Sequence, residues 1–225
     1  MKKPAEPARE FISPSDLTFG LSTCKRCLWL KYWFKLVAPG QFPLLKTLSS
    51  TQEEYFRHKQ HAEISSELRP GKIKQWGQWV RSENIKINGE ITRWRINGLY
   101  DLLGHNDDGS VALIDCKVSD SDRDSAAFYA PQLEAYAYAI EHPASSKPFE
   151  VATMGLLVWK LDNEVWRSSE KVGFSTNEFY LPVERNQEKF LALIADLIEV
   201  LEGDLPDVGE NCETCRYISA RESIF

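Results

Sequence analysis

The chain has 225 residues and a formal net charge of −6, and 43% of its residues are hydrophobic and 27% charged. This length is enough for one domain with a sizeable core, and the composition is ordinary for a globular protein. The negative charge excludes a basic surface spread over the whole chain. A nucleic acid would therefore have to be met by a local basic groove or through bound metal ions.

The N-terminal residues, 1–10, read MKKPAEPARE, with no apolar segment behind the lysines. A secretory signal is therefore not expected, and neither is a membrane span, because no apolar run is long enough. We predict a disordered tail at residues 1–10 and a single domain at residues 11–225. The five cysteines, an odd number without a signal, argue against a secreted disulfide framework and favour a cytoplasmic location.

Helices are predicted first along the chain. Residues 13–23 begin with a serine cap, a proline and an acid, which is typical of a helix start. Residues 28–36 are too aromatic on all sides for an exposed helix, so this segment should be buried. Residues 48–68 show a moderately amphipathic pattern, which predicts a second helix ended by the Pro-Gly pair at 70–71.

Strands are predicted next. Residues 72–87 indicate one or two strands, and residues 90–103 indicate a further strand pair or one bent strand. The Asn-Asp-Asp-Gly sequence at 106–109 is a hairpin signal. The strand after it, at 111–118, starts with a run of apolar residues, which favours burial on both faces.

The second half alternates between helices and strands. We predict a helix over 126–141, with Pro131 as a kink or as part of its first turn. A buried strand over 151–159, a hairpin over 164–174 and an amphipathic helix over 182–201 follow. This order predicts an α/β fold with a mixed central β-sheet flanked by helices.

An acid and a lysine follow the apolar strand directly. Asp115 and Lys117 share one face of that strand, and Cys116 points to the other. Asp101 lies on the preceding strand, and a turn at 107–109 would bring it close to Asp115. Neighbouring carboxylates repel each other unless a cation lies between them, and Mg²⁺ or Mn²⁺ suits such an oxygen site.

This arrangement suits the hydrolysis of phosphodiesters. A metal there would polarise a phosphoryl oxygen and lower the pKa of a bound water, and Lys117 could position that water or stabilise the developing charge. Gln132 and Tyr136 share a helix face, so they could reach the water, a phosphate or DNA. The alternatives are that Asp115 and Lys117 are ordinary charges at a strand end, and that Tyr136 faces the core.

Four of the cysteines form two C-x-x-C pairs near opposite ends of the chain: Cys24, Cys27, Cys212 and Cys215. Two such pairs can make a closed site of four thiolates on a metal or cluster. The site would join residues 11–45 to residues 203–225, and the alternative is four unligated cysteines. We expect Cys116 to be a core residue.

Three segments carry a resemblance to a known family: residues 98–101 (GLYD), 113–117 (LIDCK) and 129–136 (YAPQLEAY). They resemble the Gly-x-x-Asp strand, the Asp-x-Lys strand and the Gln-x-x-x-Tyr helix of the RecB-like branch of the PD-(D/E)XK nuclease superfamily. The resemblance implies a restriction-endonuclease-like fold.

The resemblance also implies roles for residues. Asp101 and Asp115 would be metal ligands, Lys117 the catalytic lysine, and Gln132 and Tyr136 supporting groups of the catalytic site. The family usually adds a His or Glu from an upstream helix. We favour Glu53 as this further metal ligand because it precedes an apolar pair as the family's residue does. The other candidates there are Glu54, His58 and His61.

Family members from CRISPR adaptation and bacterial recombination complexes carry a 4Fe-4S cluster, typically with one N-terminal and three C-terminal cysteine ligands. This chain has two and two. Four thiolates suit either a 4Fe-4S cluster, which the resemblance favours, or Zn²⁺ as the alternative.

The expected function is a Mg²⁺- or Mn²⁺-dependent deoxyribonuclease, either an exonuclease or an end-processing enzyme. Its substrate would be single-stranded DNA or duplex ends in DNA repair, recombination, or CRISPR or phage DNA metabolism, with a protein partner in a repair or CRISPR complex. The alternative is a non-catalytic nucleic-acid-binding or scaffold module that retains the fold. The presence of both acids and the lysine argues against that alternative.

Overall fold

The computed structural model describes residues 3–37, 43–119 and 125–224. The strands are β1 (Phe11–Ile12), β2 (Gly71–Ile87), β3 (Glu90–Asn106), β4 (Val111–Ser119), β5 (Val151–Ser168) and β6 (Lys171–Val183). The helices are α1 (Leu21–Thr23), α2 (Lys25–Phe34), α3 (Pro43–Phe56), α4 (Ser125–Glu141), α5 (Gln187–Glu202) and α6 (Glu213–Glu222). A π-helical turn, η1 (Asp16–Gly20), and a 3₁₀ turn, η2 (His61–Glu63), complete the described elements.

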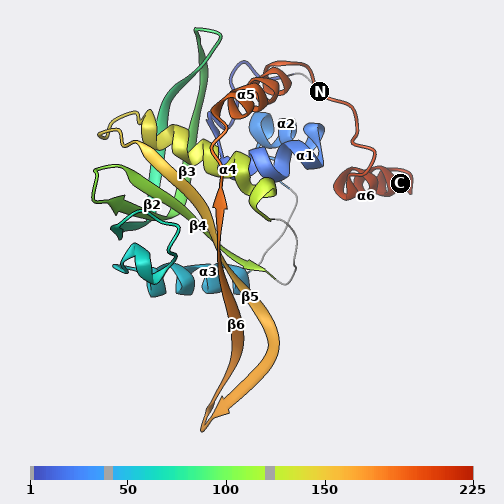
Figure 1. The fold of residues 1–225 in the computed structure, drawn as a ribbon. Coiled ribbons are helices and arrows are strands. Elements are labelled where there is room, and N and C mark those ends of the chain that lie inside the picture. Colours follow the sequence, from blue (N-terminus) through green and yellow to red (C-terminus); the bar gives the residue numbers. More distant parts are fainter. Residues whose placement is uncertain (1–2, 38–42, 120–124, 225) are drawn as a thin grey trace.

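The strands form one mixed sheet of order β1-β3-β4-β5-β6, with β2 paired to β3 (Figure 1). β3 and β4 are antiparallel, as are β5 and β6, whereas β4 and β5 are parallel and α4 connects them. Parallel neighbours need such a crossover helix. The predicted mixed sheet flanked by helices is confirmed.

Helices cover both faces of the sheet. Leu113 of β4 lies in the larger apolar cluster, together with residues of α4 and α5. Ile114 and Cys116 lie in a second cluster with Phe56 at the end of α3. β4 is therefore buried on both faces, as its apolar run predicts, and Cys116 is a core residue.

The hairpin of β2 and β3 turns at an Asn-Gly pair. Asn88 and Gly89 both have positive φ angles, 52° and 84°, as a type I′ hairpin turn requires. Residues 90–103, for which the sequence allowed a strand pair or one bent strand, belong to the single strand β3.

Two predicted helices have different bounds. The helix predicted over 48–68 is α3, which ends at Phe56, because the chain turns at His58, where φ is +64°. The helix predicted over 182–201 begins only at residue 187, because Pro182 pairs with Gly155 of β5 and Asn186 caps the helix. Within the described residues, no helix is long and apolar enough to cross a membrane.

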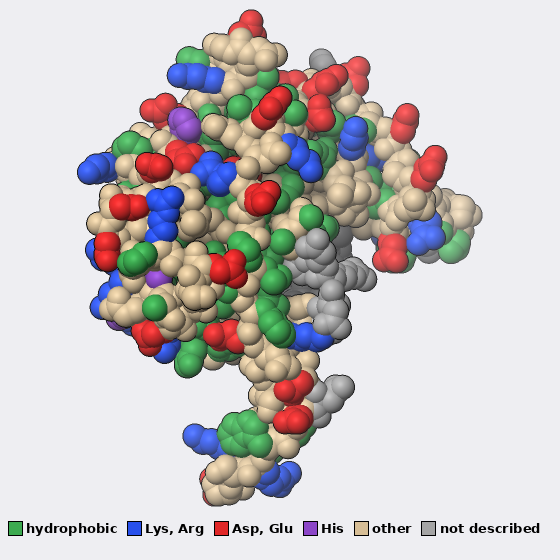
Figure 2. Space-filling model, viewed as in Figure 1, with side chains coloured by type: hydrophobic (Ala, Val, Ile, Leu, Met, Phe, Trp, Pro, Cys, Tyr) green, Lys and Arg blue, Asp and Glu red, His purple; other side chains and the backbone are tan. Residues whose placement is uncertain are grey.

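The β5–β6 hairpin extends much further than the sequence predicts. The strand predicted over 151–159 and the hairpin predicted over 164–174 are one continuous pair, which projects from the rest of the sheet (Figure 1). Figure 2 shows hydrophobic, basic and acidic side chains together on this projection. Phe174 is its most exposed aromatic residue among those described.

The sequence predicts a disordered tail at residues 1–10, of which residues 1–2 lie outside the described part. Residues 3–10 contact the domain. The ammonium group of Lys3 lies 4.1 Å from the centroid of the Trp33 ring and donates to the carbonyl oxygens of Leu201 and Gly203. Cations are favourable at a helix C-terminus, so this contact supports the end of α5.

We predict that Ile114→Ala lowers the free energy of unfolding by about 2–5 kcal/mol, because it opens a cavity between β4 and α3. The side chain of Ile114 is fully buried. Denaturant unfolding followed by circular dichroism measures the change. The matched control is Ile91→Ala, since Ile91 is 69% exposed and the change should cost less than about 0.5 kcal/mol. Equal losses in the two variants would contradict this packing.

Candidate active site

The candidate site lies where β3 and β4 separate. The two strands pair from His105 and Val111 to Leu102 and Ile114. Asp101 and Asp115 are the next residues on each strand. The backbone N–H of Cys116 donates to Oδ2 of Asp101 at 2.7 Å. A carboxylate thus accepts a hydrogen bond at the point where strand pairing stops, and this brings Asp101 and Asp115 together.

The two carboxylates act on each other. Burial and the charge of Asp115 raise the pKa of Asp101 well above its usual range. The ammonium group of Lys117 and the N–H of Cys116 act in the opposite direction without cancelling the rise. Carboxylates that repel each other in a partly dry site favour a divalent cation, and carboxylate oxygens are the ligands that Mg²⁺ and Mn²⁺ prefer. The residues present therefore fit such a metal.

Lys117 shares the face of Asp115 on β4. Its ammonium group forms an ion pair with Oδ2 of Asp115 and lies 4.6 Å from the centroid of the Tyr129 ring. Burial lowers the pKa of Lys117, but the charges of Asp115 and Asp101 outweigh it and raise the pKa above its usual range. The side chain is therefore a cation held between a carboxylate and an aromatic ring.

Gln132 fixes the second oxygen of Asp115. Its Nε2 donates to Oδ1 of Asp115 at 2.9 Å, and both side chains are buried. The amide comes from α4, whose helical backbone continues through Pro131. With one oxygen bound by Gln132 and the other by Lys117, the carboxylate of Asp115 has a defined orientation.

Tyr136 holds β3 rather than pointing to solvent. Its hydroxyl group donates to the carbonyl oxygen of Leu99 at 2.7 Å. A Cβ atom at Gly98 would lie 2.7 Å from the Tyr136 ring and 2.8 Å from Pro14. Gly98 thus allows α4 to approach the strand that carries Asp101, which gives a physical reason for a glycine three residues before the acid.

Glu53 of α3 lies close enough to the same site to act on it electrostatically. Burial and the charge of Asp115 raise the pKa of Glu53, and Glu53 in turn contributes to the raised pKa of Asp101. Oε2 of Glu53 would lie 3.1 Å from a Cβ atom at Gly77, where β2 has a positive φ angle. β2 and α3 therefore meet closely at this carboxylate.

The other three upstream candidates make different contacts. Glu54 pairs with Arg57, the ring of His58 packs against Trp76, and Nδ1 of His61 lies 2.8 Å from the carbonyl oxygen of Arg69. The structure brings Glu53 into the electrostatic environment of the two aspartates.

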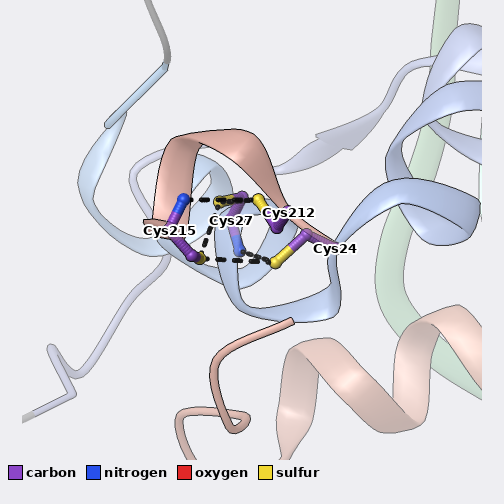
Figure 3. Close-up of side chains that lie close together, drawn as sticks. All are labelled: Cys24, Cys27, Cys212 and Cys215. Carbon is purple, nitrogen blue, oxygen red and sulfur yellow. Dashed lines mark hydrogen bonds between the residues drawn. The ribbon is translucent and has the colours of Figure 1, made fainter. Parts of the chain in front are cut away.

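The four paired cysteines converge at the starts of α2 and α6 (Figure 3). Their sulfur atoms all lie within 4.8 Å of one another. The sulfur of Cys24 is 3.7 Å from that of Cys215, and the sulfur of Cys27 is 3.6 Å from that of Cys212. The predicted joining of the two terminal regions by four cysteines is confirmed.

Each cysteine pair sits at the start of a helix. The N–H of Cys27 donates to the sulfur of Cys24, and the N–H of Cys215 donates to that of Cys212. Burial raises the pKa of Cys24, but the N–H of Cys27 and the neighbouring thiols lower it to about 7. Burial raises the pKa values of Cys27 and Cys215, so the convergence of four sulfur atoms, and not their pKa values, is what suits a metal site.

Tyr129 is a further residue of the site, to which the sequence motifs assign no role. Its ring packs under the ammonium group of Lys117. The sequence feature that points to Tyr129 is its spacing, because it lies three residues before Gln132 and so shares its helix face.

The chain belongs to the PD-(D/E)XK nuclease superfamily, whose sequence model matches residues 23–220. The crystal structure of SSO0001 is similar, with a TM-score of 0.56 and 16% sequence identity, and the match covers 94% of this chain and 85% of that chain. At this identity the likeness shows the fold. No curated protein matches the sequence.

We predict that Gly98→Ala lowers the free energy of unfolding by about 1–3 kcal/mol, because the new methyl group overlaps Tyr136 and Pro14. Thermal and denaturant unfolding measure the loss. In a Tyr136→Ala, Pro14→Ala background the same change should cost less than half as much, since coupled neighbours are not additive. An equal cost in both backgrounds would contradict the close approach.

Proposed function

We propose that this chain is a metal-dependent nuclease that hydrolyses phosphodiester bonds of DNA. The observation that carries the proposal is the convergence of Asp101, Asp115 and Lys117 where β3 and β4 separate. Membership of the nuclease superfamily supports the same reading.

Asp101 and Asp115 would hold Mg²⁺ or Mn²⁺, with Glu53 as a further ligand. The charge of Asp115 raises the pKa values of both Asp101 and Glu53, and this proximity supports the set. When bound, the metal would polarise a phosphoryl oxygen and lower the pKa of a coordinated water.

The other residues of the site would stabilise charge on the phosphate or hold the metal ligands in position. The ammonium group of Lys117 would stabilise negative charge that develops on the phosphate, because it is held in place before the reaction by Asp115 and Tyr129. Gln132 would keep Asp115 oriented, as outer partners of metal ligands do. Tyr136 would act through the backbone next to Asp101, which makes it a positioning residue.

The substrates we propose are single-stranded DNA or duplex ends, cut by exonuclease or end-processing action within a domain spanning residues 11–225. The resemblance to RecB-like nucleases supports this choice, and with it a role in DNA repair, recombination or CRISPR or phage DNA metabolism beside a protein partner. A reducing compartment such as the cytoplasm would keep the cysteines reduced and able to bind a metal.

We propose that the four cysteines bind Zn²⁺ and not the 4Fe-4S cluster that the resemblance favours. Zn–S bonds of about 2.3 Å in a tetrahedron put the sulfurs about 3.8 Å apart. In a 4Fe-4S cluster each thiolate binds a different iron, which separates the sulfurs by roughly 6 Å. The observed separations of 3.6 Å to 3.7 Å and the upper limit of 4.8 Å support a single tetrahedral ion.

We predict that the protein cleaves DNA when Mn²⁺ or Mg²⁺ is added, and that Asp115→Asn and Lys117→Met each reduce the rate by at least about 10²-fold. The first change weakens the metal site, and the second removes the cation that would stabilise charge on the phosphate. Gel assays with end-labelled single- and double-stranded DNA measure the rates. Matched controls are Asp207→Asn and Lys147→Met, two exposed residues, which should keep the native rate.

A native protein that cleaves no DNA with either metal would contradict the proposal and favour the non-catalytic scaffold. Cleavage that survives in both active-site variants would show that the activity comes from elsewhere. Circular dichroism of each variant checks that the fold is retained.

We predict about one zinc ion per purified chain, no colour, and loss of the zinc in Cys212→Ser, since a closed site needs all four thiolates. Elemental analysis and the unfolding temperature measure the change. Removing the zinc with a chelator should lower that temperature, because the metal fastens α2 to α6. Cys116→Ala is the control and should keep the zinc. A brown protein with iron and sulfide after anaerobic purification would refute the zinc proposal.

A further inference from the structure

Three aromatic rings form a cluster beside the candidate active site. Phe19 comes from η1, and Phe128 and Tyr129 lie near the start of α4. The ring centroids of Phe19 and Phe128 are 5.2 Å apart, those of Phe19 and Tyr129 are 5.9 Å apart, and those of Phe128 and Tyr129 are 5.0 Å apart. Phe19 is 47% exposed and Phe128 is 46% exposed. Large parts of these rings are therefore available to a ligand.

Packing contacts of η1 and of Tyr129 fix the position of the aromatic cluster. η1 packs against α4, and its first residue, Asp16, is buried and accepts a hydrogen bond from the hydroxyl group of Tyr32 at 2.8 Å. Tyr129 packs against the main apolar core. A single π-helical turn is rare, and such turns are frequent at functional sites. The rings thus stand on fixed backbone.

The aromatic cluster lies next to Lys117 of the candidate active site. The ammonium group of Lys117 lies 4.6 Å from the centroid of the Tyr129 ring, and Tyr129 contacts the two exposed rings. A ligand lying across the cluster would therefore meet a cation at one end and aromatic surface at the other. A nucleotide has this pattern, with an anionic phosphate and an aromatic base.

We propose that Phe19, Phe128 and Tyr129 form a stacking platform that binds an unpaired base of the substrate next to the phosphate that Lys117 faces. This proposal rests on the proposed nuclease function and narrows its substrate to single strands and frayed or overhanging ends. Aromatic side chains bind single strands because every unpaired base offers a free face, whereas the bases within a duplex already stack on each other.

Binding to a short single-stranded oligonucleotide without added Mg²⁺ or Mn²⁺ tests the platform, because it does not depend on cleavage and leaves the cysteine site undisturbed. The double variant Phe19→Ala, Phe128→Ala should bind the strand at least about fivefold more weakly than the native chain. A 2-aminopurine base in the strand should be quenched by the native chain and not by the variant. Binding to a blunt duplex should stay unchanged.

Phe174→Ala is the matched control, since Phe174 is 67% exposed on the projecting β5–β6 hairpin and belongs to no part of the platform. It should bind the strand like the native chain. The variant Phe19→Leu, Phe128→Leu keeps apolar volume without the aromatic faces. It should behave like the alanine variant if stacking is the cause, and equal unfolding temperatures check that these variants fold.

Unchanged strand binding and quenching in the double alanine variant would overturn the platform, even if the native chain cleaves DNA with Mn²⁺. Native-level binding by the leucine variant would also overturn it, because an apolar patch alone would then be sufficient. Loss of binding and quenching in both variants supports the platform, even if the native chain cleaves no DNA and the proposed nuclease function itself fails.

Discussion

The repulsion between Asp101 and Asp115 is the constraint on which the candidate site depends. The two carboxylates meet where β3 and β4 stop pairing, and burial together with the charge of Asp115 raises the pKa of Asp101. The chain offsets this with the ammonium group of Lys117, the amide of Gln132 and the N–H of Cys116. These contacts favour the charged carboxylates without cancelling the raised pKa of Asp101, and carboxylates so arranged suit a divalent cation.

The surrounding fold serves to hold that geometry. β4 is buried on both faces, so Asp115 and Lys117 stand on a fixed backbone. α4 contributes the amide of Gln132 and, through Tyr136, a hydrogen bond to the backbone before Asp101. The cysteine cluster lies outside this arrangement and joins α2 to α6, near opposite ends of the chain. The cysteine cluster and the candidate active site are thus separate groups of residues.

Much of the fold could be predicted because local patterns agree with long-range packing. The apolar run before Asp115 predicts a strand buried on both faces, and the Asn106–Gly109 turn predicts its pairing with β3. The convergence of Asp101 and Asp115 follows from that hairpin and the alternation of side chains along strands. The same reasoning accounts for Gln132, since helix spacing puts it on a face with Tyr136.

Other features depend on contacts that the sequence pattern does not show. The amphipathic pattern continues past Phe56, but the positive φ at His58 ends α3. The β5–β6 hairpin is longer than predicted because its outer residues are exposed and lack a buried apolar face. The spacing of the cysteines predicts four ligands, whereas the choice between zinc and a cluster needs the distances between sulfur atoms.

The most direct test of the central claim is anomalous diffraction from crystals grown with Mn²⁺. We predict a manganese peak within about 2.2 Å of carboxylate oxygens of both Asp101 and Asp115, and a peak that contacts neither carboxylate, or no peak at this site, would contradict the account.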